Sequence, residues 1–257
     1  MSVGIRLGVT IASAWLCLNA TAAGAAEGHI ALKHQEWPTS GMFGSFDRAA
    51  TQRGLQVYRE VCAACHGLEY VAFRNLASLG YSEDDIKAIA AEYTVTDGPN
   101  DEGEMFERPG LPFDHVPGPY PNEAAAAAAN GGKAPPDLSL IAKAREGGQD
   151  YVYSLLTGYE EPPADVEVPD GGHFNAFFPG HIIAMPPPLS DDQVTYADGT
   201  GATVSQMSRD VTQFLMWAAE PKLEERKGTG IKVILFLVVV TGLTFALKRR
   251  IWADVPH

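Results

Sequence analysis

The sequence predicts an all-α domain with long irregular loops and one small hairpin, followed by a single C-terminal transmembrane helix. Short segments with apolar residues at helical spacing alternate with loops that hold most of the 18 prolines and 26 glycines among the 257 residues. Alternating patterns typical of strands are rare. Near the C-terminus, a continuous apolar stretch has no polar face.

The N-terminus has the pattern of an export signal, assigned to residues 1–26. Arg6 supplies positive charge, the apolar stretch LGVTIASAWLCLNA follows, and the small residues of TAAGAA offer a cleavage site near Ala26. A membrane anchor is the alternative, but the apolar stretch is short and lacks a positive flank behind it. After cleavage, the mature chain keeps two cysteines, Cys62 and Cys65.

Capping residues and apolar spacing predict the helices of the domain. Asp47 is expected to cap a first helix that carries Cys62 and Cys65 on its apolar face and ends at Gly67. The other helices expected from the same signals begin at Ser82 with its capping-box partner Asp85, lie over the alanine run 124–129, open at Asp137 and at Asp150, and span about 205–220.

One hairpin and several long loops complete the domain. The segment DQVTYADGTGATV predicts a small hairpin around Asp198 and Gly199. The longest loops are rich in proline and glycine, and loops of that length in a compact domain usually wrap or bind something.

The C-terminal stretch predicts a membrane anchor, assigned to residues 227–250. Its apolar part, residues 231–247, is interrupted only by Lys232, and 17 helical residues extend about 25 Å, enough for a bilayer core. The basic residues 248–250 follow at once, so the positive-inside rule places a tail of residues 251–257 in the cytoplasm.

The domain between signal and anchor, residues 27–226, lies outside the cytoplasm in this topology, which agrees with the export signal. It carries 31 acidic and 13 basic residues, a formal charge of −18. A field of that sign repels nucleic acid and anionic lipid, and it would steer a basic protein partner. Solubility alone is the alternative explanation of the charge.

The sequence CAACH at residues 62–66 carries the chemistry. A disulfide between Cys62 and Cys65 would close a very small loop and stabilise little. A thioredoxin-like redox pair needs a preceding strand, and a structural zinc needs four ligands, whereas no second cysteine pair exists. The remaining reading is the C-x-x-C-H site of covalent haem attachment, with each thiol bonded to a haem vinyl group and His66 reaching the iron.

The iron then needs a sixth ligand or an open position, and we expect Met185 to provide it. Met185 lies in IIAMPPPL, where three prolines restrict the backbone that presents the thioether. His181 is the alternative ligand. Met207 and Met216 lie in an apolar helical pattern that favours core packing, and Met42 and Met105 lie in glycine-rich segments. The remaining candidates are the histidines His29, His34, His115 and His173.

Several long motifs together resemble the cytochrome c1 family, the membrane-anchored c-type subunit of the ubiquinol–cytochrome c reductase (cytochrome bc1) complex. They cover essentially the whole mature chain in the order of the family: YREVCAACHGLEYVAFRNL, DGPNDEGEMFERPG, PPDLSLIAKAREGG, DYVYSLLTGYEEPP, FFPGHIIAMPPPL and YADGTGATVSQMSRDVTQFLMWAAEP. The last of these is far more specific than C-x-x-C-H.

The resemblance implies a c-type cytochrome fold with one covalently bound haem c. It implies that His66 and Met185 are the axial ligands, that Arg145 lies beside a haem propionate and that Tyr151 lies near it. One feature departs from some relatives, which have a cysteine at the position of Glu160 and a partner cysteine elsewhere. Without that pair, the loop before Met185 must be held by packing and prolines alone.

The resemblance also implies a place in a complex of the bacterial inner membrane, with the haem domain in the periplasm. The chain would contact cytochrome b, accept electrons from the Rieske iron–sulfur protein and pass them to a basic soluble cytochrome c, in a complex that is dimeric. Its part in the enzyme would be electron transfer without other chemistry at the haem. The alternatives are an independent membrane-tethered cytochrome c, a haem enzyme with an open iron, and a haem-free binding module.

Overall fold

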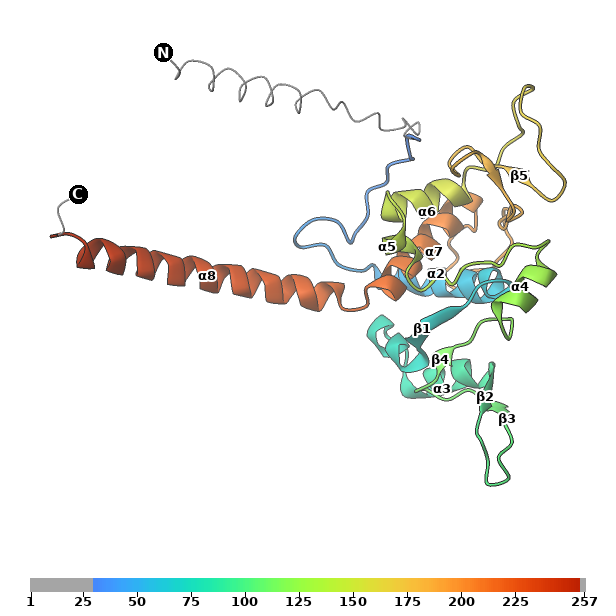
Figure 1. Ribbon diagram of the computed structural model, residues 1–257, viewed down its shortest axis with the longest axis horizontal. Helices are drawn as coiled ribbons and strands as arrows, with labels where there is room; N and C mark the ends of the chain where they lie inside the picture. The colour runs from blue at the N-terminus through green and yellow to red at the C-terminus, as the bar shows by residue number, and fades with distance from the viewer. Residues whose placement is uncertain (1–29, 255–257) are drawn as a thin grey trace, which may run out of the picture. The chain divides into compact units, whose positions relative to one another are not determined.

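The computed structural model describes residues 30–254, so the signal predicted for residues 1–26 lies outside the described residues, as do the last three residues of the predicted tail. The chain divides into two units, Met1–Ala31 and Leu32–His257. The fold described below is that of the second unit, shown from blue to red in Figure 1.

Helices make up most of the regular structure, and three two-stranded antiparallel sheets join them. The sheets pair β1 with β4, β2 with β3, and β5 with β6. In chain order the elements are α2 (Arg48–Glu60), η1 (Cys62–Ala64), β1 (Leu68–Ala72), η2 (Phe73–Leu79), α3 (Glu83–Ala91), β2 (Thr94–Asp97), β3 (Phe106–Pro109), β4 (His115–Val116), α4 (Glu123–Ala129), α5 (Ile141–Ala144), α6 (Gly148–Leu156), β5 (His173–Phe174), β6 (Ile182–Ile183), α7 (Val204–Ala219) and α8 (Leu223–Ile251).

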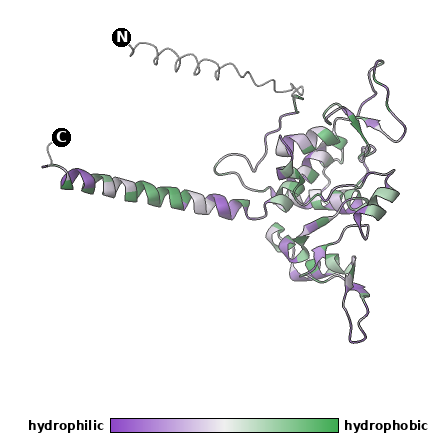
Figure 2. Ribbon diagram, in the orientation of Figure 1, coloured by the Kyte–Doolittle hydropathy of each residue, from purple (hydrophilic) through white to green (hydrophobic). Residues whose placement is uncertain are grey.

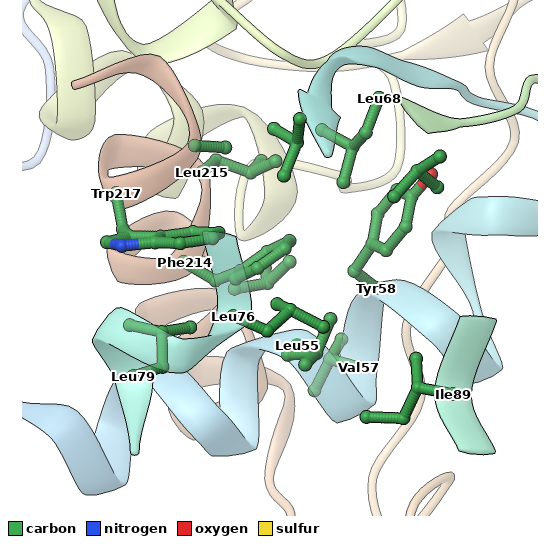
Figure 3. Close-up of a cluster of buried hydrophobic side chains, with 14 of the residues drawn as sticks. Leu55, Val57, Tyr58, Leu68, Leu76, Leu79, Ile89, Phe214, Leu215 and Trp217 are labelled. Atoms are coloured by element: carbon green, nitrogen blue, oxygen red, sulfur yellow. The ribbon is translucent and has the colours of Figure 1, made fainter. Parts of the chain in front are cut away.

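The core forms where α2 packs against α7. Apolar side chains from both helices meet in one cluster, which Figure 3 shows with Leu55 and Tyr58 of α2 facing Phe214 of α7. The helices approach closely because Gly54 has no side chain: a Cβ there would lie 2.1 Å from the carbonyl oxygen of Asp210. The glycine therefore sets the distance between the two central helices.

A buried ion pair joins the same two helices. The guanidinium of Arg53 on α2 donates two hydrogen bonds to the carboxylate of Asp210 on α7, at 2.9 and 3.0 Å, and the Asp210 side chain is fully buried. Arg53 also donates to Asp198 at 2.8 Å. Because a buried carboxylate needs charged or hydrogen-bonded partners, this cluster fixes the register of α2 on α7.

Local signals predict several helices correctly. Asp47 caps α2 as expected, and the alanine run forms α4, whose cap Asn122 was not predicted. Ser82 and Asp85 form the expected capping box of α3. The helix predicted over about 205–220 is α7, which begins one residue earlier, after its N-cap Thr203.

Other expectations about the fold are wrong. The first helix ends at Glu60 rather than at Gly67, and a short 3-10 turn continues it through the cysteine pair. No strands form around Asp198 and Gly199, where a turn is closed by a hydrogen bond from the Gly199 amide to the Tyr196 carbonyl. The three small sheets, each on other segments, mean that the domain is not purely all-α.

Two acidic residues predicted to open helices have other partners. Asp137 lies four residues before α5, and its carboxylate accepts hydrogen bonds from the amides of Glu69 and Ser139. Asp150 lies inside the first turn of α6, where its carboxylate accepts from the indole of Trp37 at 2.7 Å. Both carboxylates connect distant segments instead of capping their own helices.

The C-terminal helix α8 starts at Leu223, four residues earlier than the anchor assigned to residues 227–250. Leu223 itself is buried in the core of the domain. Beyond it, the helix has one stretch long and apolar enough to cross a membrane, and none of that stretch is buried against the rest of the chain. Figure 2 shows this apolar middle of α8 between polar ends.

Candidate functional site

The residues of C-x-x-C-H lie on the short turn that leaves α2. The carbonyl oxygen of Cys62 accepts hydrogen bonds from the amides of Cys65 at 3.1 Å and of His66 at 2.9 Å. This turn keeps the two cysteines and the histidine together, although they are not on an α-helix as expected. Both thiols are free, and Cys62 packs against the edge of the core.

His66 is held by a segment about seventy residues further along the chain. Its Nδ1 lies 2.7 Å from the carbonyl oxygen of Pro136, which has no proton to give, so Nδ1 carries the hydrogen and donates it. The other ring nitrogen, Nε2, then has the free electron pair that a metal ion needs.

Three further hydrogen bonds join the segment that holds His66 to the residues that follow His66. The amide of Leu138 donates to the Gly67 carbonyl at 2.9 Å, and the amide of Glu69 donates to the Asp137 carboxylate at 2.8 Å. The amide of Tyr70 donates to the hydroxyl of Ser139 at 3.1 Å. The segment 136–139 is therefore fastened along residues 66–70, and the orientation of the imidazole is set before any ligand binds.

Burial keeps the His66 imidazole and the Cys62 thiol neutral. It lowers the pKa of His66, against the opposing effects of the Pro136 carbonyl and of Asp137. Burial, with a further contribution from Cys65, raises the pKa of the Cys62 thiol to about 12. A neutral imidazole and free thiols beside an apolar core are what covalent haem attachment with histidine ligation requires, so these residues fit the group.

Tyr58 supports the same turn from inside the core. Its hydroxyl donates to the carbonyl oxygen of His66 at 2.9 Å, while its ring lies against Phe214. Burial raises the pKa of Tyr58, so the phenol stays protonated and remains a donor. The helix face that carries the aromatic core thus also fixes the backbone of the candidate ligand.

Met185 follows β6 and is half-buried. Its carbonyl oxygen accepts a hydrogen bond from the hydroxyl of Tyr159 at 3.1 Å. The hairpin that precedes it is held by the fully buried Asn175, whose side chain donates to the Leu155 carbonyl at 2.8 Å and accepts from the Phe177 amide at 3.0 Å. The expectation that packing and prolines alone hold this loop is therefore wrong, because the hydrogen bonds of the buried Asn175 side chain also fix it, without a cysteine pair.

The alternative ligands have other surroundings. The ring of His181 stacks on Phe174 with centroids 5.7 Å apart, and its backbone has a positive φ of 62° at the hairpin turn. Met207 is fully buried in the core, which matches the packing role expected for it. Met42 and Met105 are exposed by 60% and 61%.

Arg145 and Tyr151 lie close enough for the charge of Arg145 to act on the Tyr151 phenol. Arg145 is exposed at the end of α5, and Tyr151 lies on α6. Burial raises the pKa of Tyr151, and the positive charge of Arg145 opposes that rise. Tyr151 in turn adds to the burial-driven rise in the pKa of Tyr159, the tyrosine that donates to the Met185 carbonyl.

Sequence reasoning missed three groups at this site: the carbonyl of Pro136, the hydroxyl of Tyr58 and the hydroxyl of Tyr159. Only Tyr58 had a usable signal, its position on the apolar face of the helix that leads to the cysteines. A backbone acceptor has no side-chain pattern, and Tyr159 is linked to Met185 only through the fold. Among residues 30–254, no group of three or more histidines, cysteines and acids could hold a metal ion by itself.

The chain is similar to known proteins over most of its length. A family model described as "Cytochrome C1 family" matches residues 37–255. Cytochrome c1 of Rhodospirillum rubrum is 53% identical over 252 residues, which cover 92% of this chain and 93% of that protein. The protein of Schizosaccharomyces pombe named "Cytochrome c1, heme protein, mitochondrial" is 52% identical over 231 residues, 90% of this chain and 75% of that protein.

A Candida albicans protein named "Cytochrome b-c1 complex catalytic subunit, mitochondrial" is 50% identical over 241 residues, 93% of this chain and 84% of that protein. The family match spans both the candidate haem site and the C-terminal helix. The chain belongs to the cytochrome c1 family.

Proposed function

We propose that this chain carries single electrons within a cytochrome bc1 complex, on one haem c bound covalently through Cys62 and Cys65. The haem would supply an iron that changes between two oxidation states. The observation that carries the proposal is the hydrogen bond from His66 Nδ1 to the Pro136 carbonyl, because it leaves Nε2 for the iron.

The distal ligand in this proposal is Met185. Its backbone is held by Tyr159 and by the prolines that follow, so a thioether presented there moves little. Little movement suits a centre that only exchanges electrons, because the site need not rearrange at each transfer. Arg145 would pair with a haem propionate, and Tyr151 would lie beside it.

The domain would lie in the periplasm of a bacterial cell, tethered to the inner membrane by α8 with its C-terminus in the cytoplasm. The basic residues 248–250 at the end of α8 support this orientation. A short connection supports a fixed place in a complex: α7 ends at Ala219, α8 begins at Leu223, and Leu223 is buried in the domain. A free, tethered cytochrome would usually have a long flexible linker instead.

The partners in this proposal are cytochrome b, the Rieske iron–sulfur protein as donor and a basic soluble cytochrome c as acceptor, within a dimeric complex. The charge of −18 on residues 27–226 supports the choice of a basic acceptor. A haem enzyme such as a peroxidase would need an open iron position, which Met185 would occupy.

Purification from membranes tests the proposal. We expect a b-type cytochrome and an iron–sulfur protein to copurify with the chain, haem to stay on the chain in a denaturing gel, and the oxidised protein to show the far-red absorption band of methionine ligation. Isolation without those subunits would favour the lone tethered cytochrome. A gel without haem would favour a binding module, and a missing band would contradict ligation by Met185.

A further inference from the structure

We infer that the loop of residues 38–45 is a second membrane contact, which inserts its apolar tip into the lipid interface beside α8. The tip consists of Met42 and Phe43, which are exposed by 60% and 83%. Two adjacent large apolar side chains at the tip of one loop form a small exposed apolar patch, and such a patch is suited to an apolar partner.

A backbone hydrogen bond closes the loop, and its shape presents the tip outward. The amide of Ser45 donates to the carbonyl of Pro38 at 2.9 Å and closes the loop at its base. The turn uses Gly41 at a positive φ of 70°, and a Cβ on Gly44 would lie 2.2 Å from the carbonyl oxygen of Ser40. In this shape the side chains of Met42 and Phe43 remain exposed.

The loop is fastened to the membrane helix at a defined height. The ammonium of Lys227 donates to the carbonyl oxygens of Thr39 at 2.6 Å and Gly41 at 2.7 Å, and it lies 3.3 Å from that of Gly44. Lys227 is four residues before the apolar part of α8 begins at Ile231, about 6 Å along the helix axis. The interfacial layer on each side of the hydrocarbon core is about 5–7 Å thick, so the loop lies at its level.

A second contact fixes the same arrangement from the other end of the loop. Glu224 on α8 accepts hydrogen bonds from the amide of Phe46 at 2.7 Å and from the guanidinium of Arg48 at 2.7 Å. The tip is thus held beside α8, and Figure 1 shows this part of the chain next to the start of that helix.

Charge favours lipid as the occupant. The loop PTSGMFGS has no charged residue, although the domain around it carries −18. The ammonium of Lys227 is bound by loop carbonyls. An aromatic ring and a thioether on an uncharged loop are suited to the boundary between head groups and acyl chains. The occupant proposed is therefore a phospholipid bilayer rather than another protein.

Site-directed spin labelling tests this inference on the haem-loaded full chain, reconstituted alone in phospholipid nanodiscs. Met42→Cys carries the label at the tip, with Phe43→Cys as a second variant. Met105→Cys is the matched control, because Met105 is exposed to the same extent on the β2–β3 hairpin. Val238→Cys reports on the apolar middle of α8.

The measured quantity is the ratio of the collision rate with oxygen, which concentrates in lipid, to the collision rate with an aqueous nickel chelate. We expect this ratio to be several-fold higher for the label at position 42 than for the label at position 105. Equal collision ratios at positions 42 and 105 would overturn the inference. The inference would also be overturned if the label at position 42 were shielded from the nickel chelate only in the purified complex and not in the chain reconstituted alone, because the occupant would then be a protein. Nickel access at position 238 would instead show that α8 itself does not span the bilayer, and the membrane assignment would fail together with the inference.

Discussion

The side chain of Met185 has the largest expected effect on the redox chemistry. Axial ligands and their surroundings spread haem potentials over about 0.8 V, and a thioether ligand raises the potential. We expect Met185→Ala to lower the midpoint potential by on the order of 0.1–0.3 V, with the haem still attached. Redox titration measures this, and Met105→Leu, on an exposed side chain, serves as the control. An unchanged potential in Met185→Ala would point to another ligand.

The hydroxyl of Tyr58 stabilises the turn that carries His66. Removing it in Tyr58→Phe leaves the His66 carbonyl without this donor, and we expect the free energy of unfolding to fall by about 1–2 kcal/mol. Denaturant titration of the haem-loaded protein measures the change. Tyr70→Phe, at an exposed tyrosine, should leave stability within about 0.5 kcal/mol of wild type. Equal stability of the two variants would contradict the role of Tyr58.

Asp198 makes one part of the stability depend on pH. Hydrogen bonds from Thr200, and then the one from Arg53, lower its pKa from 3.8 to about 2. Because the pKa is lower in the folded state, this contribution is complete well above pH 3.8 and is lost as the pH falls toward 2. We therefore expect Asp198→Asn to be less stable than wild type at neutral pH, and the gap to narrow at acid pH. Denaturant titrations of both proteins at neutral and at acid pH measure the difference in the free energy of unfolding. A difference that stays the same at the two pH values would rule out this explanation.

At the scale of the helices, Gly54 controls how closely α2 can lie against α7. A methyl group there would meet the backbone of Asp210 and the Cβ of Phe214, at 2.1 and 2.7 Å. We expect Gly54→Ala to destabilise the domain by about 3 kcal/mol, although alanine favours a helix over glycine by about 1 kcal/mol. Gly228→Ala on α8, where nothing lies within 4 Å, should be neutral or slightly stabilising. Thermal or denaturant unfolding compares the pair, and similar effects would show that the helices can separate without cost.

Elements with local signals could be predicted from the sequence, and elements with distant partners could not. Asp47 and Ser82 cap helices a few residues away, so their role is readable along the chain. Asp137 and Asp150 have the same chemistry, but their carboxylates bind Glu69 and Trp37 in other segments. The small sheets were missed because strands of two to five residues have too few positions to show alternation.

The candidate site divides in the same way. Cys62, Cys65 and His66 are adjacent in the chain, and their spacing predicts their chemistry. The group that orients His66 is a backbone carbonyl seventy residues away, which only the fold brings close. The PPDL motif was visible in the sequence, but two of its roles were not. Its Pro136 carbonyl accepts the hydrogen bond from His66, and the segment 136–139 is hydrogen-bonded along residues 66–70.

For the whole molecule, the distribution of charge predicts how electron transfer responds to salt. The acidic domain and a basic acceptor attract each other, and this attraction speeds their encounter. The screening length falls from about 30 Å at 0.01 M ionic strength to about 8 Å at 0.15 M, so the field reaches less far beyond the surface. We expect the second-order rate of electron transfer to a basic cytochrome c to fall severalfold over this range.

Stopped-flow absorbance of the reduced, haem-loaded chain mixed with an oxidised basic cytochrome c measures that rate. An acidic acceptor of similar potential is the control, and its rate should rise with salt because screening reduces repulsion. A flat profile with the basic acceptor would remove docking as the purpose of the charge and leave solubility. The loop at residues 38–45 belongs to the same argument: it is uncharged within a strongly acidic domain, so attraction of the acceptor and contact with lipid are assigned to different surfaces of the chain.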